Sequence, residues 1–443
     1  MSSVSRHFFA AAATIVLVAA SATAQLLPNL GGPIGLPTGN IPVAGPIIRD
    51  VVGGPGGPSG STAVSPTLDT LGVSPAVARL DSASLLDLRR ARLIELVRQN
   101  RRELEMDGQG APVRRGQLVA IDPDPASLAM AARAGFRIIE DAPSASLGLR
   151  MVLLGAPRGL DTREALKRLR AAAPSIDADF DHIFEPAGGA LVPLGASLAA
   201  APGRVGGARI AMVDGGVASH PSMAGAAIEQ RGFAGAPQPT GHGTAVASLI
   251  VGNHGPFRGA ARGASLLVAD VYCGSRAAGS ASAIVRALDW VASRRPQVAN
   301  ISLVGPPNRL MARAVAALQA RGIAVVAAVG NDGPAAPPQY PASYPGVVSV
   351  TGVDAKGRAL PEAGRARHID FAAPGADLAA ALPGRGYARV RGTSFAAPLV
   401  TARLASVGTV EGLAREAKPG KGRVGRGIVC GDCRVPPKAV GAK

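Results

Sequence analysis

Short apolar runs alternate with helix-like patterns along the second half of the chain, from Ala208 onwards. The runs ARIAMV, SLLVADVY, VANISLV, IAVVAAVG and VVSVTGV predict buried strands. Between them, segments such as ASAIVRALDWVASRR and RLMARAVAALQARG repeat their apolar residues at helical spacing. Continuous apolar strands that alternate with helices are typical of a parallel sheet covered on both faces. We therefore predict a doubly wound, mostly parallel α/β domain over residues 208–435.

A smaller pattern precedes this domain, over residues 111–190. The segments QLVAI, FRIIE, LRMVLLG and IDADFDHIF predict strands, and PASLAMAARAG and DTREALKRLRAAA predict helices. Their order, βαββαβ, favours a small ferredoxin-like α+β domain. From residue 187 to 207 the chain returns to Gly, Ala, Leu and Pro, so we predict a linker, placed at 191–207 between the two domains.

The first 110 residues fall into three parts. Residues 8–24 form an apolar run that follows Arg6 and His7 and ends in small residues, which predicts a signal peptide over residues 1–24. A membrane anchor is the alternative, but the run is short for a span and no charged stop-transfer sequence follows it. We therefore expect no stable membrane span and a secreted or periplasmic protein. Residues 25–110 combine a Gly/Pro-rich linker with a basic amphipathic helix near residues 80–105.

The charge of the chain is strongly basic. It has 47 Lys and Arg against 30 Asp and Glu, a net charge of +17, and basic residues are dense in its last 30 positions. Residues 408–443 contain no Phe, Tyr or Trp on which a base could stack. We therefore expect no specific nucleic-acid partner, and a solvated basic tail at 436–443.

Three cysteines are present, Cys273, Cys430 and Cys433. The pair Cys430–Cys433 has the spacing of a redox motif, but it lies among Arg, Lys and Pro and far from a βαβ unit. A structural bridge is favoured over redox chemistry, and a bridge from Cys273 to one of the pair is one arrangement. The spacing leaves the connectivity open.

Four polar residues stand at the ends of predicted elements. Asp214 ends one strand, Asn331 follows another, His242 lies at the start of a helix, and Ser394 opens the helix GTSFAAPLV. Each has a structural explanation: a turn for Asp214 and Asn331, a helix start for His242, a cap for Ser394. However, ligands of such sheets bind at the carboxyl ends of the strands. A carboxylate, an imidazole, a carboxamide and a hydroxyl gathered there are the groups that acyl transfer needs.

The motifs, in the order Asp214, GHGTAVASLI, AAVGNDG and GTSFAAPLV, resemble those of the subtilisin-like serine peptidases. The chain order Asp, His, Ser is itself a known mark of that family. The resemblance covers about residues 204–435 and extends to YPASYPGVVSVTGVD and DFAAPG, while residues 115–190 resemble the family's pro-domains more weakly. It implies a serine endopeptidase with protein or peptide substrates and a pro-domain in cis as partners. The sequence shows no Asp-rich loop of the calcium-binding type, so we expect no metal and no cofactor.

The resemblance also implies a role for each site residue. Ser394 would be the nucleophile, His242 its general base, and Asp214 the group that orients His242. The side chain of Asn331 would donate to the oxyanion together with the Ser394 backbone N–H. A second set would bind substrate, through strand pairing and one wall of the pocket for the residue before the scissile bond. Its members are Ser302, Leu303, Val304, Gly305, Ala328, Val329 and Gly330.

Two positions depart from the family's pattern. Gly215 and Gly216 follow the aspartate where the family usually has Ser or Thr, so a supporting hydroxyl is missing beside Asp214. Val304 stands where Gly is usual and adds bulk beside the substrate strand. A catalytically weak relative that binds peptides or cell-surface polymers is the alternative function. The intact set Asp214, His242, Asn331 and Ser394 favours the enzyme.

The small-residue segment before the α/β domain predicts self-cleavage between about Pro186 and Gly207. Such a segment binds in an extended form with little cost from ordering bulky side chains. The alternative is a permanent two-domain protein with an ordinary interdomain linker.

Overall fold

The computed structural model describes residues 81–188, 190–194, 207–384 and 386–441. The chain divides into two compact units, residues 1–57 and 58–443, and all described residues belong to the second. The expected signal peptide (1–24) and the Gly/Pro-rich part of segment 25–110 lie outside the described residues. Within the described part, no helix is long and apolar enough to cross a membrane.

The α/β domain is built on a seven-stranded sheet whose neighbouring strands all run parallel. In spatial order the strands are β17 (Phe371–Pro374), β16 (Val348–Val353), β15 (Ala324–Ala328), β13 (Val298–Ile301), β8 (Arg209–Asp214), β12 (Ser265–Asp270) and β9 (Ile228–Gly232). The core strands are almost wholly buried, as their continuous apolar runs predict.

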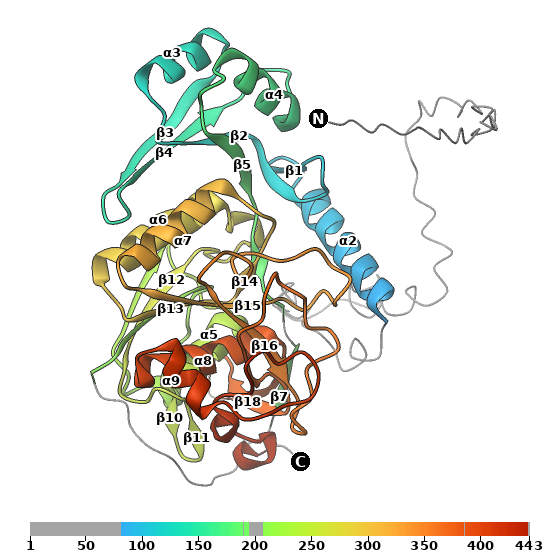
Figure 1. Cartoon of the computed structure of the whole chain (residues 1–443), viewed down its shortest axis with the longest axis vertical. Helices are drawn as coiled ribbons and strands as arrows, with labels where there is room; N and C mark the ends of the chain where they lie inside the picture. The colour runs from blue at the N-terminus through green and yellow to red at the C-terminus, as the bar shows by residue number, and fades with distance from the viewer. Residues whose placement is uncertain (1–80, 189, 195–206, 385, 442–443) are drawn as a thin grey trace, which may run out of the picture. The chain divides into compact units, whose positions relative to one another are not determined.

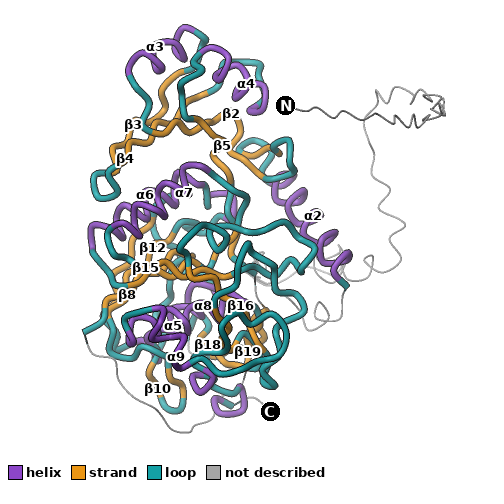
Figure 2. Tube along the Cα trace, viewed as in Figure 1, coloured by secondary structure: helices purple, strands orange, loops and turns teal. Residues whose placement is uncertain are grey.

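Helices cover both faces of this sheet (Figures 1 and 2). On one face, α5 (Gly241–Val251) and α8 (Thr393–Val407) share a buried cluster with Ile210 and Met212 of β8. On the other, α6 (Ala281–Arg294) and α7 (Arg309–Ala320) share a second cluster with Ala211 and Val213. Alternate residues of β8 therefore point into two cores, and the predicted doubly wound fold is confirmed.

The preceding α+β domain has the predicted βαββαβ order. Its elements are β2 (Pro112–Ile121), α3 (Pro125–Arg133), β3 (Arg137–Ser144), β4 (Leu149–Gly155), α4 (Thr162–Ala172) and β5 (Ala178–His182), with a short added strand β1 (Leu104–Met106). All pairings in its sheet are antiparallel. Figure 1 shows α3 and α4 on one side of this sheet and α6 and α7 on the other.

Polar contacts join the α+β domain to the first turns of α6 and α7. Asp181 accepts the backbone N–H of Ser282 at 2.9 Å, and Asp179 accepts that of Arg309 at 2.8 Å. Burial raises the pKa of the Asp181 carboxyl despite its hydrogen bonds from Ser282. Because helix N-termini leave backbone N–H groups unpaired, these carboxylates hold the domain in register on the two helices.

The amphipathic helix predicted near residues 80–105 is α2 (Ser82–Gln99). Asp81 caps it by accepting the backbone N–H of Ser84 at 2.8 Å. Its buried residues are Leu85, Leu93 and Leu96. Figure 1 shows α2 leading into β1 and the α+β domain.

The linker predicted from residue 187 is partly wrong, because the chain forms strands on both sides of Ala187. Strand β6 (Glu185–Pro186) pairs antiparallel with β14 (Leu303–Val304). Strand β7 (Ala190–Leu194) pairs antiparallel with β19 (Tyr387–Arg391), whose other neighbour is β18 (Leu378–Ala381). Residues 195–206 of the expected linker lie outside the described residues.

The remaining elements are short: β10 (Asn253–His254), β11 (Phe257–Arg258) and α9 (Val410–Glu416). A disulfide joins Cys430 to Cys433, so a bridge is present but the arrangement with Cys273 is wrong, and Cys273 is a free thiol. The predicted solvated tail is also partly wrong, because Val440 is buried in the larger core.

Candidate active site

Asp214 and His242 meet at the carboxyl end of β8. The His242 Nδ1 lies 2.8 Å from the Asp214 Oδ1, and that oxygen also accepts the Gly215 backbone N–H at 2.7 Å. Both side chains are buried, which removes competing water from the pair. The buried His242 Nε2 has no hydrogen-bond partner within the described part of the chain, so it is free to take a proton.

Close neighbours explain both glycines after Asp214: Thr240 beside Gly215, and the Gln238 carbonyl, 2.4 Å from a Cβ at position 216, beside Gly216. A Cβ at position 215 would lie 2.4 Å from the Thr240 Oγ1, so a Ser or Thr cannot fit there. The Thr240 hydroxyl caps α5, accepting the Gly243 backbone N–H at 2.9 Å, and thereby fixes the start of the helix that carries His242. Thr240 therefore occupies the space beside Gly215 that a Ser or Thr side chain would need.

Asn331 and Ser394 lie together at the start of α8. The Asn331 Oδ1 accepts the Thr393 backbone N–H at 2.9 Å, which turns the Asn331 Nδ2 toward the carbonyls of Ala187 and Gly188. The Ser394 Oγ donates to the Gly188 carbonyl at 2.7 Å. The ring of Phe395, the next residue, lies 5.4 Å from that of His242 between centroids. The four predicted residues are thus brought to one place.

Capping does not explain Ser394. The N-cap of α8 is Gly392, whose φ of 143° is unfavourable for other residues, and it makes no side-chain cap hydrogen bond. Ser394 is instead the second helical residue, and it is fully buried in this form of the chain. Among described groups, its hydroxyl is bonded to Gly188 and not to His242.

A buried polar chain that sequence reasoning missed supports Ser394 from below. The Ser302 Oγ donates to the Ser394 carbonyl at 3.1 Å and accepts from the Asn300 Nδ2 at 2.9 Å. The Thr401 hydroxyl donates to the Asn300 Oδ1 at 3.0 Å. The signal in the sequence is a polar Asn300 inside the apolar strand VANI, because a buried amide needs partners.

Residues 184–187 lie in the cleft as an extended strand. The Ala187 N–H donates to the Ser302 carbonyl at 2.9 Å, and the Phe184 N–H donates to the Gly279 carbonyl at 2.7 Å. The Phe184 ring is fully buried and occupies the space beside Gly305, where a Cβ would lie 2.4 Å from it. The predicted strand of residues 302–305 therefore pairs with an extended segment, and that segment belongs to the same chain.

The side chain of Ala187 is buried. It is 2% exposed and belongs to the same buried cluster as Val304 and Ala328. At Gly330, where φ is 89°, a Cβ would lie 3.4 Å from the Val304 Cγ1. The Val304 side chain therefore lies within van der Waals contact of a Cβ at position 330, in the predicted wall.

Four charged residues gather at the rim of the cleft, and sequence reasoning missed all of them. Arg92 bonds to Glu185 at 3.2 Å and to Asp332 at 3.0 Å, and Arg89 pairs with Asp332 at 3.2 Å. Burial alone would lower the pKa of the Arg92 guanidinium, but the two carboxylates outweigh it and raise that pKa. Arg92 is therefore firmly cationic.

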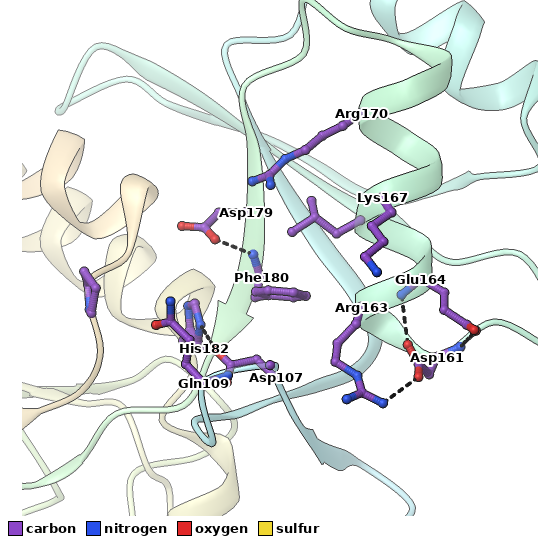
Figure 3. A pocket seen from close by; sticks show the side chains of 13 residues that line it. Asp107, Gln109, Asp161, Arg163, Glu164, Lys167, Arg170, Asp179, Phe180 and His182 are labelled. Carbon is purple, nitrogen blue, oxygen red and sulfur yellow. Dashed lines mark hydrogen bonds and ion pairs between the residues drawn. The ribbon is translucent and has the colours of Figure 1, made fainter. Parts of the chain in front are cut away.

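A second cavity, of about 660 Å³, lies between the α+β domain and the loop before α7, and none of the four predicted site residues lines it (Figure 3). His182 bonds there to Asp107 at 3.2 Å and to Asn308 at 3.0 Å. Burial would raise the pKa of the Asp107 carboxyl, but hydrogen bonds from His182 and two backbone N–H groups lower it. This cavity is a junction between the two domains, distinct from the cleft.

Comparison with known proteins agrees with this geometry. The family model described as Subtilase family matches residues 206–412. Subtilisin Savinase of Lederbergia lenta is 34% identical over 206 residues, which are 45% of this chain and 76% of that protein. The chain belongs to the subtilase family. This family membership identifies the chain as a subtilisin-like serine protease.

Two further relatives share less of their length with the chain than Subtilisin Savinase does. The alkaline protease of Alkalihalobacillus alcalophilus is also 34% identical, but the chain spans only 54% of it. The crystal structure of fervidolysin from Fervidobacterium pennivorans, a keratinolytic enzyme related to subtilisin, matches with a TM-score of 0.62 and 20% identity. That match covers 74% of this chain and 62% of fervidolysin, and it bears on the fold alone.

Proposed function

We propose that this subtilase is a serine endopeptidase that hydrolyses peptide bonds through an acyl-enzyme. The observation that carries the proposal is the extended segment at Ala187, whose carbonyl accepts from the Asn331 Nδ2 while the Ser394 hydroxyl lies against the next carbonyl. The Ala187–Gly188 peptide unit therefore lies between an oxyanion donor, which bonds to its first carbonyl, and a nucleophile, which bonds to the next one.

The reaction follows from the groups around Ser394. Its hydroxyl turns from the Gly188 carbonyl to the unpartnered His242 Nε2, which takes the proton as the Oγ attacks the substrate carbonyl carbon. Asp214, bonded to the His242 Nδ1, stabilises the imidazolium that forms. The oxyanion accepts from the Asn331 Nδ2 and the Ser394 backbone N–H. His242 then protonates the leaving amine as the C–N bond breaks, and water hydrolyses the ester by the reverse use of the same groups.

The first substrate is the chain itself, and the scissile bond is Ala187–Gly188. Ala187 donates its N–H to Ser302, buries its side chain and offers its carbonyl to Asn331. Gly188 also bonds to Asn331, at 2.7 Å, but its φ of 72° departs from the extended form of the preceding strand. Cleavage after Ala187 would make residues 111–187 a pro-domain and leave a mature enzyme that begins at Gly188.

The same segment indicates the preferred substrates. Val304 leaves room for a small residue before the scissile bond, as Ala187 is. The buried Phe184, three residues earlier, lies in an apolar site beside Gly305 and Tyr272, and the Tyr272 hydroxyl donates to its carbonyl at 3.1 Å. We expect peptides with an aromatic residue at that position and Ala before the cut to be hydrolysed best. Export to the cell exterior or periplasm, through residues 1–24, is part of the proposal.

Self-cleavage tests the proposed function directly. The wild-type chain and Ser394→Ala, both without residues 1–24, are expressed and their intact mass and new N-termini are read. We expect the wild type to yield a chain that begins at Gly188 and the variant to stay uncut. A new N-terminus at residue 189 would move the scissile bond by one residue. Identical cutting in both chains would assign the cleavage to another protease and contradict the proposal.

A further inference from the structure

The helix α2 lies outside the α+β domain, yet it reaches the catalytic cleft. The residues that face the cleft are spaced three or four apart along α2, which places them on one face of the helix: Leu85, Arg89, Arg92 and Leu96. The opposite face is exposed, as Arg90 and Ile94 illustrate. One face of α2 therefore packs against the rest of the protein, and the opposite face is open to solvent.

The first end of α2 rests on the loop that carries the oxyanion donor. Leu85 is buried against Gly333, where a Cβ would lie 2.8 Å from the leucine Cδ1. Gly333 follows Asn331 by two residues, with Asp332 between them. Arg89 and Arg92 both bond to the Asp332 carboxylate, at 3.2 and 3.0 Å. The helix thus contacts the loop through an apolar side chain and two cations.

The middle of α2 crosses over the segment in the cleft. Arg92 also bonds to Glu185, which lies two residues before Ala187 in strand β6. The Glu185 carboxylate is 6% exposed and the Asp332 carboxylate 7%. One guanidinium therefore ties the substrate-like strand to the catalytic loop, with both carboxylates largely withdrawn from water.

The last turn of α2 closes the cleft on the side of His242. Leu96 packs in a buried cluster with Ile183 of the bound segment and Ala277 of the α/β domain. Leu96, Gln99 and Asn100 line a cavity of about 460 Å³ that Asp214 and His242 also line. The helix thus covers residues 183–185 from the solvent side.

We propose that α2 is a strap that keeps the cleaved pro-domain on the enzyme, so that the active site opens only after the contacts of Arg89 and Arg92 are lost. The inference rests on the proposed protease function. Cutting the Ala187–Gly188 bond puts α2 and residues 183–187 on one fragment, and Arg89 and Arg92 still pair with Asp332 of the α/β domain. Because Arg92 also pairs with Glu185, the end of this fragment stays in the cleft as an inhibitor. Without the two arginines, Glu185 and Asp332 would be two buried carboxylates with no cation between them, a costly arrangement.

The test compares Arg89→Met/Arg92→Met with Arg90→Met in the full chain. Methionine keeps the apolar length of arginine and its helix propensity. Arg90 lies on the same helix, and its ion-pair partner among the described residues is the exposed Asp87 alone. After self-cleavage, the release of the pro-domain is followed by size-exclusion chromatography, and activity by hydrolysis of a peptide that ends in the sequence Phe-Glu-Pro-Ala before a fluorophore. We expect the double variant to cut at the same bond and to shorten the lag before activity at least about tenfold. Arg90→Met should match the wild type.

An unchanged lag and an equally long-lived complex in the double variant would overturn the strap. The double variant is judged not to fold if it fails to cut itself while the wild type does. In that case the lag before activity and the release of the pro-domain are measured on Arg89→Met alone. If no chain cuts itself or the peptide, the proposed function has failed, and the strap is judged on Ser394→Ala chains instead. There, faster amide exchange over α2 and residues 183–187 in the double variant than in Arg90→Met supports the strap, and equal exchange contradicts it.

Discussion

At the scale of the residue, hydrogen bonds from backbone N–H groups orient the side chains of Asn331 and Asp214. The Thr393 N–H holds the Asn331 Oδ1, so the other end of the amide faces the cleft, and the Gly215 N–H helps to hold Asp214 against His242. Both orientations are built into the fold before a substrate arrives. This preorganisation is what makes such donors effective toward a developing charge.

Asn331→Ala should lower the turnover number while leaving KM nearly unchanged, because the donor acts on a charge that is absent from the ground state. In subtilisins one donor of this kind contributes about 10²–10³-fold to turnover, and we expect a loss of that order here. Steady-state kinetics of the mature enzyme on a small peptide measure it. A change in KM alone, with the turnover number unchanged, would show that Asn331 does not donate to the oxyanion.

His242→Ala and Ser394→Ala should each lower activity by at least about a thousandfold, as general-base catalysis typically contributes 10²–10⁴-fold. The double variant should lose little more than either single one, since the proton transfer and the attack are one step. The comparison uses the residual hydrolysis of one peptide by all three chains. Losses that multiply would contradict the shared step.

At the scale of the element, the pairing of short strands determines which side chains lie near the segment in the cleft. Strand β14 supplies both Leu303 and Val304, and Val304 shares a buried cluster with Ala187, whereas Leu303 belongs to the other cluster. A one-residue shift of its register would turn the other side chain inward, so the pairing with β6 fixes which residue lies near Ala187. The sequence shows that Val304 is bulkier than the usual Gly, but only this strand pairing shows which neighbouring residues its side chain lies against.

Val304→Gly should widen the pocket and raise kcat/KM for peptides with Leu or Phe before the scissile bond, relative to Ala, by about tenfold or more. A few methylene groups in an apolar pocket are worth about that factor. Val304→Ala serves as the intermediate control. If the ratio of kcat/KM values for Leu and Ala peptides does not change in either variant, Val304 does not set the size of the pocket.

Helix α4 gives a prediction about the stability of the α+β domain. Asp161 caps it and forms a capping box with Glu164, and the Glu164 backbone N–H and Arg163 lower the pKa of the Asp161 carboxyl. Asp161→Ala should destabilise the α+β domain by about 1 kcal/mol, whereas Asp161→Asn should retain most of the cap. Urea unfolding of the uncut Ser394→Ala chain, followed by amide exchange in α4, measures the difference.

The sign of the pH dependence of this cap follows from the lowered pKa of Asp161. The stabilisation is present above the unfolded value near 3.8 and is lost as the pH falls through the lower folded value. The Asp161→Asn chain should therefore lose less stability than the wild-type sequence on acidification below pH 4. Equal losses in the two chains would show that the cap carboxylate does not contribute.

At the scale of the whole molecule, the sequence predicts the two domains and the four residues of the site, because buried strands and helices leave periodic apolar patterns and strand ends meet at one edge. It does not predict that residues 184–188 lie in the cleft, since backbone hydrogen bonds to distant residues hold this segment and such bonds leave no periodic pattern in the sequence. It predicts α2 from its spacing, but its partners Glu185 and Asp332 are 93 and 240 positions away from Arg92.

The most direct test of the central claim is covalent labelling of the mature enzyme with a fluorophosphonate, followed by identification of the modified peptide. The account predicts a single label on Ser394, blocked by His242→Ala, and no label while the uncut segment around Ala187 occupies the cleft. A label on another residue, or none on a chain that hydrolyses peptides, would contradict the assignment of Ser394 as the nucleophile.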